Sequence, residues 1–280
     1  MNKESIFTKQ KSFPRDFDFE YRQQCLATIN GWFSPASHGL FSFYLDFQNK
    51  HNINGNLGEI GVWEGKSASV ISSFPKTGEH IYLIDPLIKK NAETIYRNID
   101  MVCRKIPDNL NLNNCLSENF LNNNTESLRK SFRFFHIDGC HTGTNVYSDL
   151  ELADVLLHED SILVVDDFFN PSYPQITEAL YKYLFLNPYK FRLFFNGFNK
   201  AYLCRPGKYS FYYSYTFENL QKEMLSKGMA FTIKKTSSIG DSYTLSAEEY
   251  QPQVDSRLGY QGPDWEPDII DCIERRNIYD

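Results

Sequence analysis

The sequence predicts a doubly wound α/β fold with a mostly parallel sheet. Four short apolar runs each lead into an acidic residue: "NLGEIGVW", "HIYLIDP", "SFRFFHIDG" and "SILVVDDFF". Strands that are buried on both faces of a parallel sheet have this continuous apolar character. Segments with helical spacing lie between the runs, so the order of elements predicts βαβ units with right-handed crossovers.

Three regions follow from this pattern. Residues 1–55 are aromatic and helical in pattern, residues 56–205 carry the alternating strands and helices, and residues 206–280 form a C-terminal extension of mixed α+β pattern. A chain of 280 residues can bury a sizeable core as one large domain with additions. We expect the aromatic stretch around Trp32, Phe33 and Phe41 to pack on the core and to cover part of an acceptor site as a lid.

The later elements are predicted in order along the chain. An Asn-rich segment surrounds a short third strand near Asn114–Ser117, and a helix over Val146–Leu157 places its apolar residues on one face. Two apolar runs around Asn196-Gly197 predict an antiparallel hairpin that closes the sheet. A helix near 216–227 and two strands, "AFTIKKT" and "DSYTLSA", follow, and the last residues read as a wrapped tail or lid.

Composition excludes several classes of protein. A net charge of -6 without a long basic run disfavours nucleic-acid binding. The sequence shows no signal peptide and no apolar span, so we expect a cytoplasmic protein that does not bind membranes. Six cysteines lack a CxxC pair, which indicates reduced thiols and disfavours a zinc site. The aromatic ends are compatible with a dimer surface, so a homo-oligomer stays open.

The first strand leads into a glycine loop, "GEIGVWEGKS". Gly61 and Gly65 can let a ligand approach the backbone, although an ordinary strand-to-helix turn would also need them. The G-x-G-x-x-G fingerprint is absent, which disfavours NAD. Asp85 ends the second strand 24 residues beyond Gly61, near the interval at which an acid meets ribose hydroxyls. These residues favour a nucleoside cofactor without a pyrophosphate.

Two of these motifs resemble the class I S-adenosylmethionine-dependent methyltransferases, which have a Rossmann-like core. "EIGVWEGKS" is similar to their first motif and "YLIDP" to their second, over about residues 56–205. The resemblance implies S-adenosylmethionine as cofactor. The residues that it and the strand positions assign to cofactor binding are Glu59, Gly61, Gly65, Ser67, Asp85, Ser117 and Asp138.

A narrower resemblance covers "HIDGCHTGTNVYSDLELADVLLHEDSILVVDDF". This stretch is similar to the pattern of sugar and natural-product O-methyltransferases related to macrocin O-methyltransferase. The resemblance implies a divalent metal, commonly Mg²⁺, held by Asp138, Asp166 and Asp167, with His141 as the base. The sequence departs from the pattern at residues 142–144, where relatives often carry an aromatic residue, so the acceptor side of the pocket is expected to differ.

Elementary chemistry supports these assignments. Acids at the ends of neighbouring strands lie close enough to share one hard cation, which makes a bound hydroxyl easier to deprotonate. The acids could instead cap helices, and His141 could be a surface histidine. We expect His136 to be a core histidine, and Asp149 to lie in the first turns of a helix, outside the chemistry.

The expected function is therefore metal-assisted O-methylation of a small acceptor. The expected acceptor is a sugar hydroxyl of a glycan precursor or secondary metabolite. Three alternatives stay open: a metal-independent methyltransferase with His141 as base, an iron-dependent hydroxylase, and a regulatory protein that binds S-adenosylmethionine without catalysis. A single candidate histidine argues against the hydroxylase.

Overall fold

The computed structural model describes residues 17–123, 125–237 and 243–249. These residues contain one sheet with the strands β1 (Asn56–Ile60), β2 (Ile81–Ile84), β3 (Leu110–Asn113), β4 (Phe132–Ile137), β5 (Leu157–Val165), β6 (Arg192–Gly197), β7 (Lys200–Cys204), β8 (Phe231–Ser237) and β9 (Tyr243–Glu249). The strand order is β3-β2-β1-β4-β5-β7-β6-β9-β8. The first five strands are parallel, and β7 lies antiparallel between β5 and β6. The predicted fold class is confirmed.

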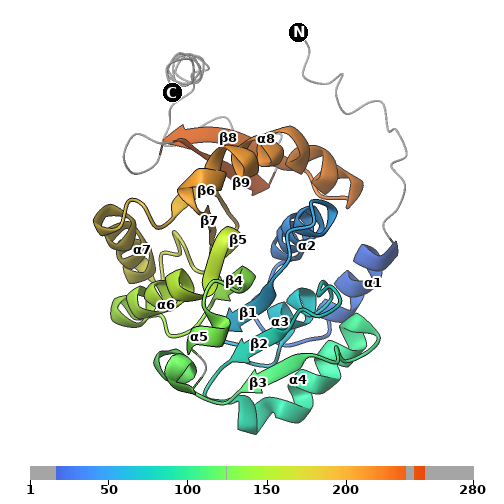
Figure 1. The fold of residues 1–280 in the computed structure, drawn as a ribbon. Coiled ribbons are helices and arrows are strands. Elements are labelled where there is room, and N and C mark those ends of the chain that lie inside the picture. Colours follow the sequence, from blue (N-terminus) through green and yellow to red (C-terminus); the bar gives the residue numbers. More distant parts are fainter. Residues whose placement is uncertain (1–16, 124, 238–242, 250–280) are drawn as a thin grey trace.

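Helices cover both faces of this sheet (Figure 1). They are α1 (Phe17–Leu26), α2 (Pro35–Lys50), α3 (Lys66–Ile71), α4 (Ile88–Cys103), α5 (Thr125–Leu128), α6 (Gly143–Leu156), α7 (Pro174–Leu186) and α8 (Tyr209–Ser226), with 3₁₀ turns η2 (Ser117–Asn123) and η3 (Pro206–Lys208). One apolar cluster joins the sheet to α1, α2, α3, α4 and α8, and a second joins it to α5, α6 and α7. β4 serves both clusters, since Phe134 belongs to the first and Phe135 to the second.

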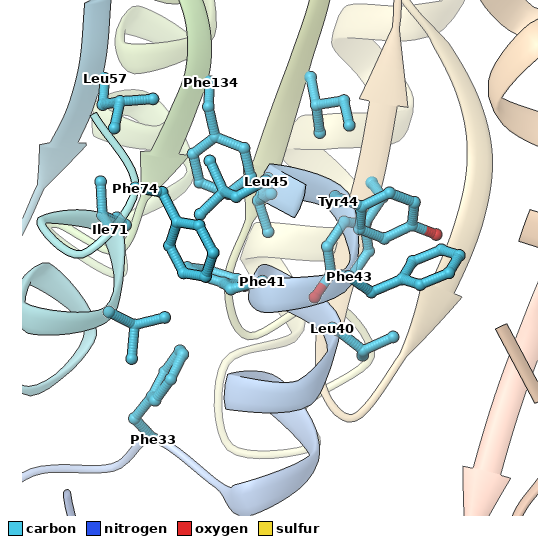
Figure 2. Packing of buried hydrophobic residues seen from close by; sticks show 14 of the residues in the cluster. Phe33, Leu40, Phe41, Phe43, Tyr44, Leu45, Leu57, Ile71, Phe74 and Phe134 are labelled. Atoms are coloured by element: carbon cyan, nitrogen blue, oxygen red, sulfur yellow. The ribbon is translucent and has the colours of Figure 1, made fainter. Parts of the chain in front are cut away.

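Helix α2 builds much of the first cluster (Figure 2). Ser34 caps its start by accepting a hydrogen bond from the Ser37 backbone N–H at 3.0 Å. Phe41 of this helix lies edge-on to Phe134 of β4, with ring centroids 5.2 Å apart. Before the helix, Trp32 is 90% exposed whereas Phe33 is buried. The N-terminal segment therefore packs on the core, as predicted, and leaves one aromatic ring outside it.

Two predicted positions were wrong by a few residues. The third strand is Leu110–Asn113 rather than the segment near Asn114–Ser117. The side-chain amides of Asn111 and Asn113 donate hydrogen bonds to the carbonyls of Ile81 and Leu83 on β2, so these asparagines stabilise the edge of the sheet. The hairpin is confirmed, but its turn residues are Phe198 and Asn199, with φ of 53° and 61°. Gly197 instead stays in β6, paired with Lys200.

The C-terminal strands extend the same sheet. β8 and β9 form an antiparallel pair, and β9 runs parallel to β6. The predicted tail beyond residue 249 lies outside the described residues, and the domain boundaries after residues 55 and 205 stay a prediction. Within the described part of the chain, every helix is too short or too polar to cross a membrane.

Candidate active site

A cavity of about 620 Å³ opens at the carboxyl ends of β1, β4 and β5. Its wall also includes the loop between α1 and α2, the first turn of α3, and the turn between β6 and β7. The chain proceeds from β1 to β2 on one side and from β4 to β5 on the other, so the strand order reverses at this point. Open α/β sheets bind their ligands at such switch points.

The structure requires glycine at the two predicted cofactor positions, Gly61 and Gly65, for different reasons. Both have a φ of 84°, a left-handed conformation that favours glycine. A Cβ on Gly61 would lie 1.7 Å from the carbonyl oxygen of Asp138, so this glycine lets the ends of β1 and β4 meet. Gly65 precedes α3 and faces Ile95 rather than the cavity. Gly61 and the buried Ser67 contribute to the cavity wall.

Asp85 holds the glycine loop in place. Its Oδ2 accepts hydrogen bonds from the backbone N–H groups of Val62 at 2.9 Å and Trp63 at 3.1 Å, and its Oδ1 accepts from Leu87 at 2.7 Å. Trp63 has a φ of 49°, which is costly for an aromatic residue, so these bonds help to fix a strained segment of the cavity wall. Contact of Asp85 with a ribose stays a prediction.

Two further predicted cofactor residues are bonded to other side chains. Glu59 is fully buried and accepts a hydrogen bond from His136 at 2.7 Å. Ser117 is hydrogen-bonded to Asp149, which is only 2% exposed in the second turn of α6. Burial raises the pKa of Asp149 to about 6, although the Ser117 bond opposes the shift. Neither Glu59 nor Ser117 contributes to the wall of the 620 Å³ cavity.

Asp138, His141 and Asp167 form an acidic cluster on the cavity wall. The His141 Nε2 lies 3.1 Å from Asp167 Oδ2 and 3.8 Å from Asp138 Oδ1. The imidazole stacks on Tyr173 with centroids 4.2 Å apart, and the Asn170 amide donates to Asp167 Oδ1 at 2.6 Å. The nearby carboxylate of Asp138 raises the pKa of His141, whereas burial and the charge of Asp166 raise the pKa of Asp138 to about 6.

Asp166 belongs to a separate chain of buried charges. Lys200 Nζ donates to Asp166 Oδ2, and His136 Nε2 lies 3.4 Å from the same oxygen. His136 also donates to Glu59, so four neighbouring strands contribute one charge each. Burial opposes the charged form of His136, but its bonds to Asp166 and Glu59 raise its pKa to about 9. His136 is the core histidine that the sequence predicts, and through Asp166 it also connects the core to the cavity, which the sequence does not predict.

A family described as a methyltransferase domain matches residues 59–168. The chain contains a methyltransferase domain. No curated protein matches the sequence. The O-methyltransferase NovP shares the fold at 13% identity, over 61% of this chain and 80% of NovP, with a TM-score of 0.52. A protein from Corynebacterium glutamicum does so at 12% identity, over 72% and 93% of the two chains, with the same TM-score of 0.52.

A domain of this family implies S-adenosylmethionine as methyl donor, and the donor atoms of the site also suit a divalent cation. One ligand atom each of Asp138, His141 and Asp167 lie within 4.8 Å of one another, and the same holds for His136, Asp138 and Asp166. Such oxygen-rich sets fit Mg²⁺ or Mn²⁺. The predicted trio of Asp138, Asp166 and Asp167 is thus divided, because Asp166 already faces Lys200 and His136.

The rest of the cavity wall combines aromatic rings with neutral polar groups. Trp32 and Trp63 belong to this wall and are 90% and 47% exposed. Sequence reasoning did not identify Lys200 as a site residue. A usable signal was present, because a lysine at the start of a buried strand needs an acidic partner, and Asp166 directly follows the neighbouring strand. The polar residues of this wall are Asn30, Ser34, Asn170, Ser172 and Asn199.

Proposed function

We propose that this methyltransferase transfers the methyl group of S-adenosylmethionine to a hydroxyl of a small acceptor, with a sugar hydroxyl as the expected target. The observation that carries the proposal is the cluster of Asp138, His141 and Asp167 on the wall of a cavity beside the glycine loop. A hydroxyl must lose its proton as it attacks the methyl group, and an imidazole can accept that proton near neutral pH. NovP, which shares the fold, is an O-methyltransferase.

His141 is the proposed base. Stacking on Tyr173 fixes the plane of its ring, and Asn170 holds the carboxylate of Asp167 toward Nε2. After His141 accepts a proton, its positive charge lies between two carboxylates, which stabilise the imidazolium. Most of the rate gain is expected from holding acceptor and donor in line, since the transfer needs no covalent enzyme intermediate.

The proposed metal ligands are Asp138 and Asp167, with Asp166 joining only if Lys200 releases it. A bound Mg²⁺ would stabilise negative charge on the acceptor oxygen. The Nε2 of His141 faces the same two carboxylates, so a bound cation and the Nε2 proton of the histidine would compete for them. A metal-independent reaction is therefore the second candidate, favoured by the pairing of Asp166 with Lys200 and of Asp167 with His141.

The proposed acceptor class follows from the composition of the cavity wall. Exposed tryptophans offer flat apolar faces that suit sugar rings, and nearby amides and hydroxyls can exchange hydrogen bonds with sugar hydroxyls. A volume of about 620 Å³ is in the range of small-molecule sites.

Calorimetry with S-adenosylmethionine, followed by an activity screen, tests the proposal. Nucleotide sugars and glycosides are incubated with the donor, and mass spectrometry looks for products heavier by one methylene. Absence of donor binding would refute both forms of the proposal. Full activity after exhaustive treatment with chelator would leave the metal-independent form. Donor binding without any methylated product would favour the regulatory alternative.

A further inference from the structure

The charges on the cavity wall come from different elements of the fold. The acids Asp138, Asp166 and Asp167 lie at the ends of β4 and β5, and one of the two lysines, Lys200, is paired with Asp166. The other, Lys66, begins α3 on the side of the glycine loop. The ends of β4 and β5 therefore carry the negative charge of the wall, and Lys66 supplies a positive charge from the start of α3.

Lys66 has a neutral partner. Its Nζ donates to the Gly31 carbonyl oxygen at 3.1 Å, and among the described residues no carboxylate forms an ion pair with it. An ammonium group has three hydrogens, so two stay available for a ligand in the cavity. Partial burial lowers the pKa of Lys66, which indicates that its charge has lost hydration that a neutral carbonyl does not replace. An anion placed there would restore the balance.

We propose that Lys66 binds the carboxylate of S-adenosylmethionine and thereby sets the direction in which the donor lies. This inference rests on the proposed function. The donor carries a sulfonium, an amino group and a carboxylate, and only the carboxylate is negative. With the carboxylate at Lys66, the positively charged sulfonium lies toward Asp138 and Asp167, where its methyl group can face an acceptor beside His141.

The contact to Gly31 connects this donor subsite to the acceptor wall. Gly31 lies in the loop between α1 and α2, next to the exposed Trp32, and the Asn30 amide of the same loop donates to Glu64 at 3.3 Å. Lys66 therefore holds the loop and faces the donor at the same time. A substitution of Lys66 could act through the loop as well as through the carboxylate, and the test must separate these effects.

The test compares two donors that differ only in the carboxylate. Calorimetry measures Kd for S-adenosylmethionine and for decarboxylated S-adenosylmethionine with the wild type, Lys66→Gln, Lys66→Arg and Lys90→Gln. Lys90 is an exposed lysine of α4 outside the cavity wall and serves as the control. We expect Lys66→Gln to weaken S-adenosylmethionine binding about tenfold or more, as loss of a charged hydrogen bond does, and Lys66→Arg to restore most of it.

The decarboxylated donor distinguishes the outcomes. Its affinity should change less than about twofold in Lys66→Gln, because it has no carboxylate to lose. Equal weakening of both donors would assign Lys66 to the loop alone, and no weakening of either would remove it from the subsite. Either result overturns the inference while the proposed function stands. If the wild type binds neither donor, both fall together.

Discussion

Replacing Gly61 with alanine tests whether this glycine is required by the contact between β1 and β4. The new Cβ would lie 1.7 Å from the Asp138 carbonyl oxygen, in a backbone with a φ of 84°. The left-handed conformation costs an L-residue about 1–2 kcal/mol. Forcing two strand ends apart adds about 1–3 kcal/mol, as overpacking does. We therefore expect the free energy of unfolding to fall by about 2–5 kcal/mol.

Gly78→Ala is the matched control. Gly78 has a φ of 85°, but nothing lies within 4 Å of a Cβ placed on it, so only the conformational cost of about 1–2 kcal/mol applies. Urea unfolding followed by tryptophan fluorescence measures both variants, with the m-value checked for two-state behaviour. Equal losses in the two variants would refute the steric argument and would leave cofactor approach as the reason for the glycine.

Three further predictions concern the acids and the histidine of the site. His141→Gln should bind S-adenosylmethionine normally and lose about 100-fold or more in kcat. In the wild type kcat/KM should rise with pH through the pKa of His141, which the nearby carboxylate of Asp138 raises above 6.5. A rise that persists in the variant would exclude His141 as base. Calorimetric titration should show that Asp167→Asn binds Mn²⁺ about tenfold more weakly than the wild type, and that Asp166→Asn changes Mn²⁺ affinity less. The opposite order would contradict the pairing of Asp166 with Lys200. Asp149→Asn should stabilise the protein by up to about 3 kcal/mol above pH 6, because burial raises the pKa of this carboxyl from 3.8 to about 6 and its ionisation in the folded state is unfavourable. This gain should disappear as the pH falls from 6 to below 4. Urea unfolding at several pH values measures the gain, and a gain that does not depend on pH would contradict the assignment to the Asp149 carboxyl.

The parallel core could be predicted from the sequence because each buried strand is marked by its own apolar run. The run "FRFFHI" is buried at every position of β4, and continuous burial is what its apolar composition predicts. The position of Asp138 at the cavity follows from the same run, since the residue after a strand lies at the carboxyl end of the sheet. The third strand was displaced because Asn111 and Asn113 use their amides to bond β2, a contact that asparagine-rich composition does not reveal.

The pairing of the acids could not be predicted because it depends on register between strands far apart in sequence. Val165 of β5 lies opposite Ala201 of β7, so the next residue, Asp166, meets Lys200. Asp167 instead has a φ of 55°, which turns the chain away and directs this carboxylate toward His141. Two adjacent acids therefore belong to different clusters, a division that the sequence "VVDDF" does not express.

The buried chain from Glu59 through His136 and Asp166 to Lys200 explains why these two clusters stay separate. Charges without water are costly unless each has an opposite partner, and here two acids alternate with two bases under Phe41 and Phe33. Removing any one member would leave an unpaired buried charge, so Asp166 is held by its neighbours on both sides. Asp138 and Asp167 lie on the cavity side instead, where the proposed base and the proposed cation would meet an acceptor hydroxyl. In the proposed reaction, the core of the sheet thus determines which of its terminal carboxylates would take part in the chemistry.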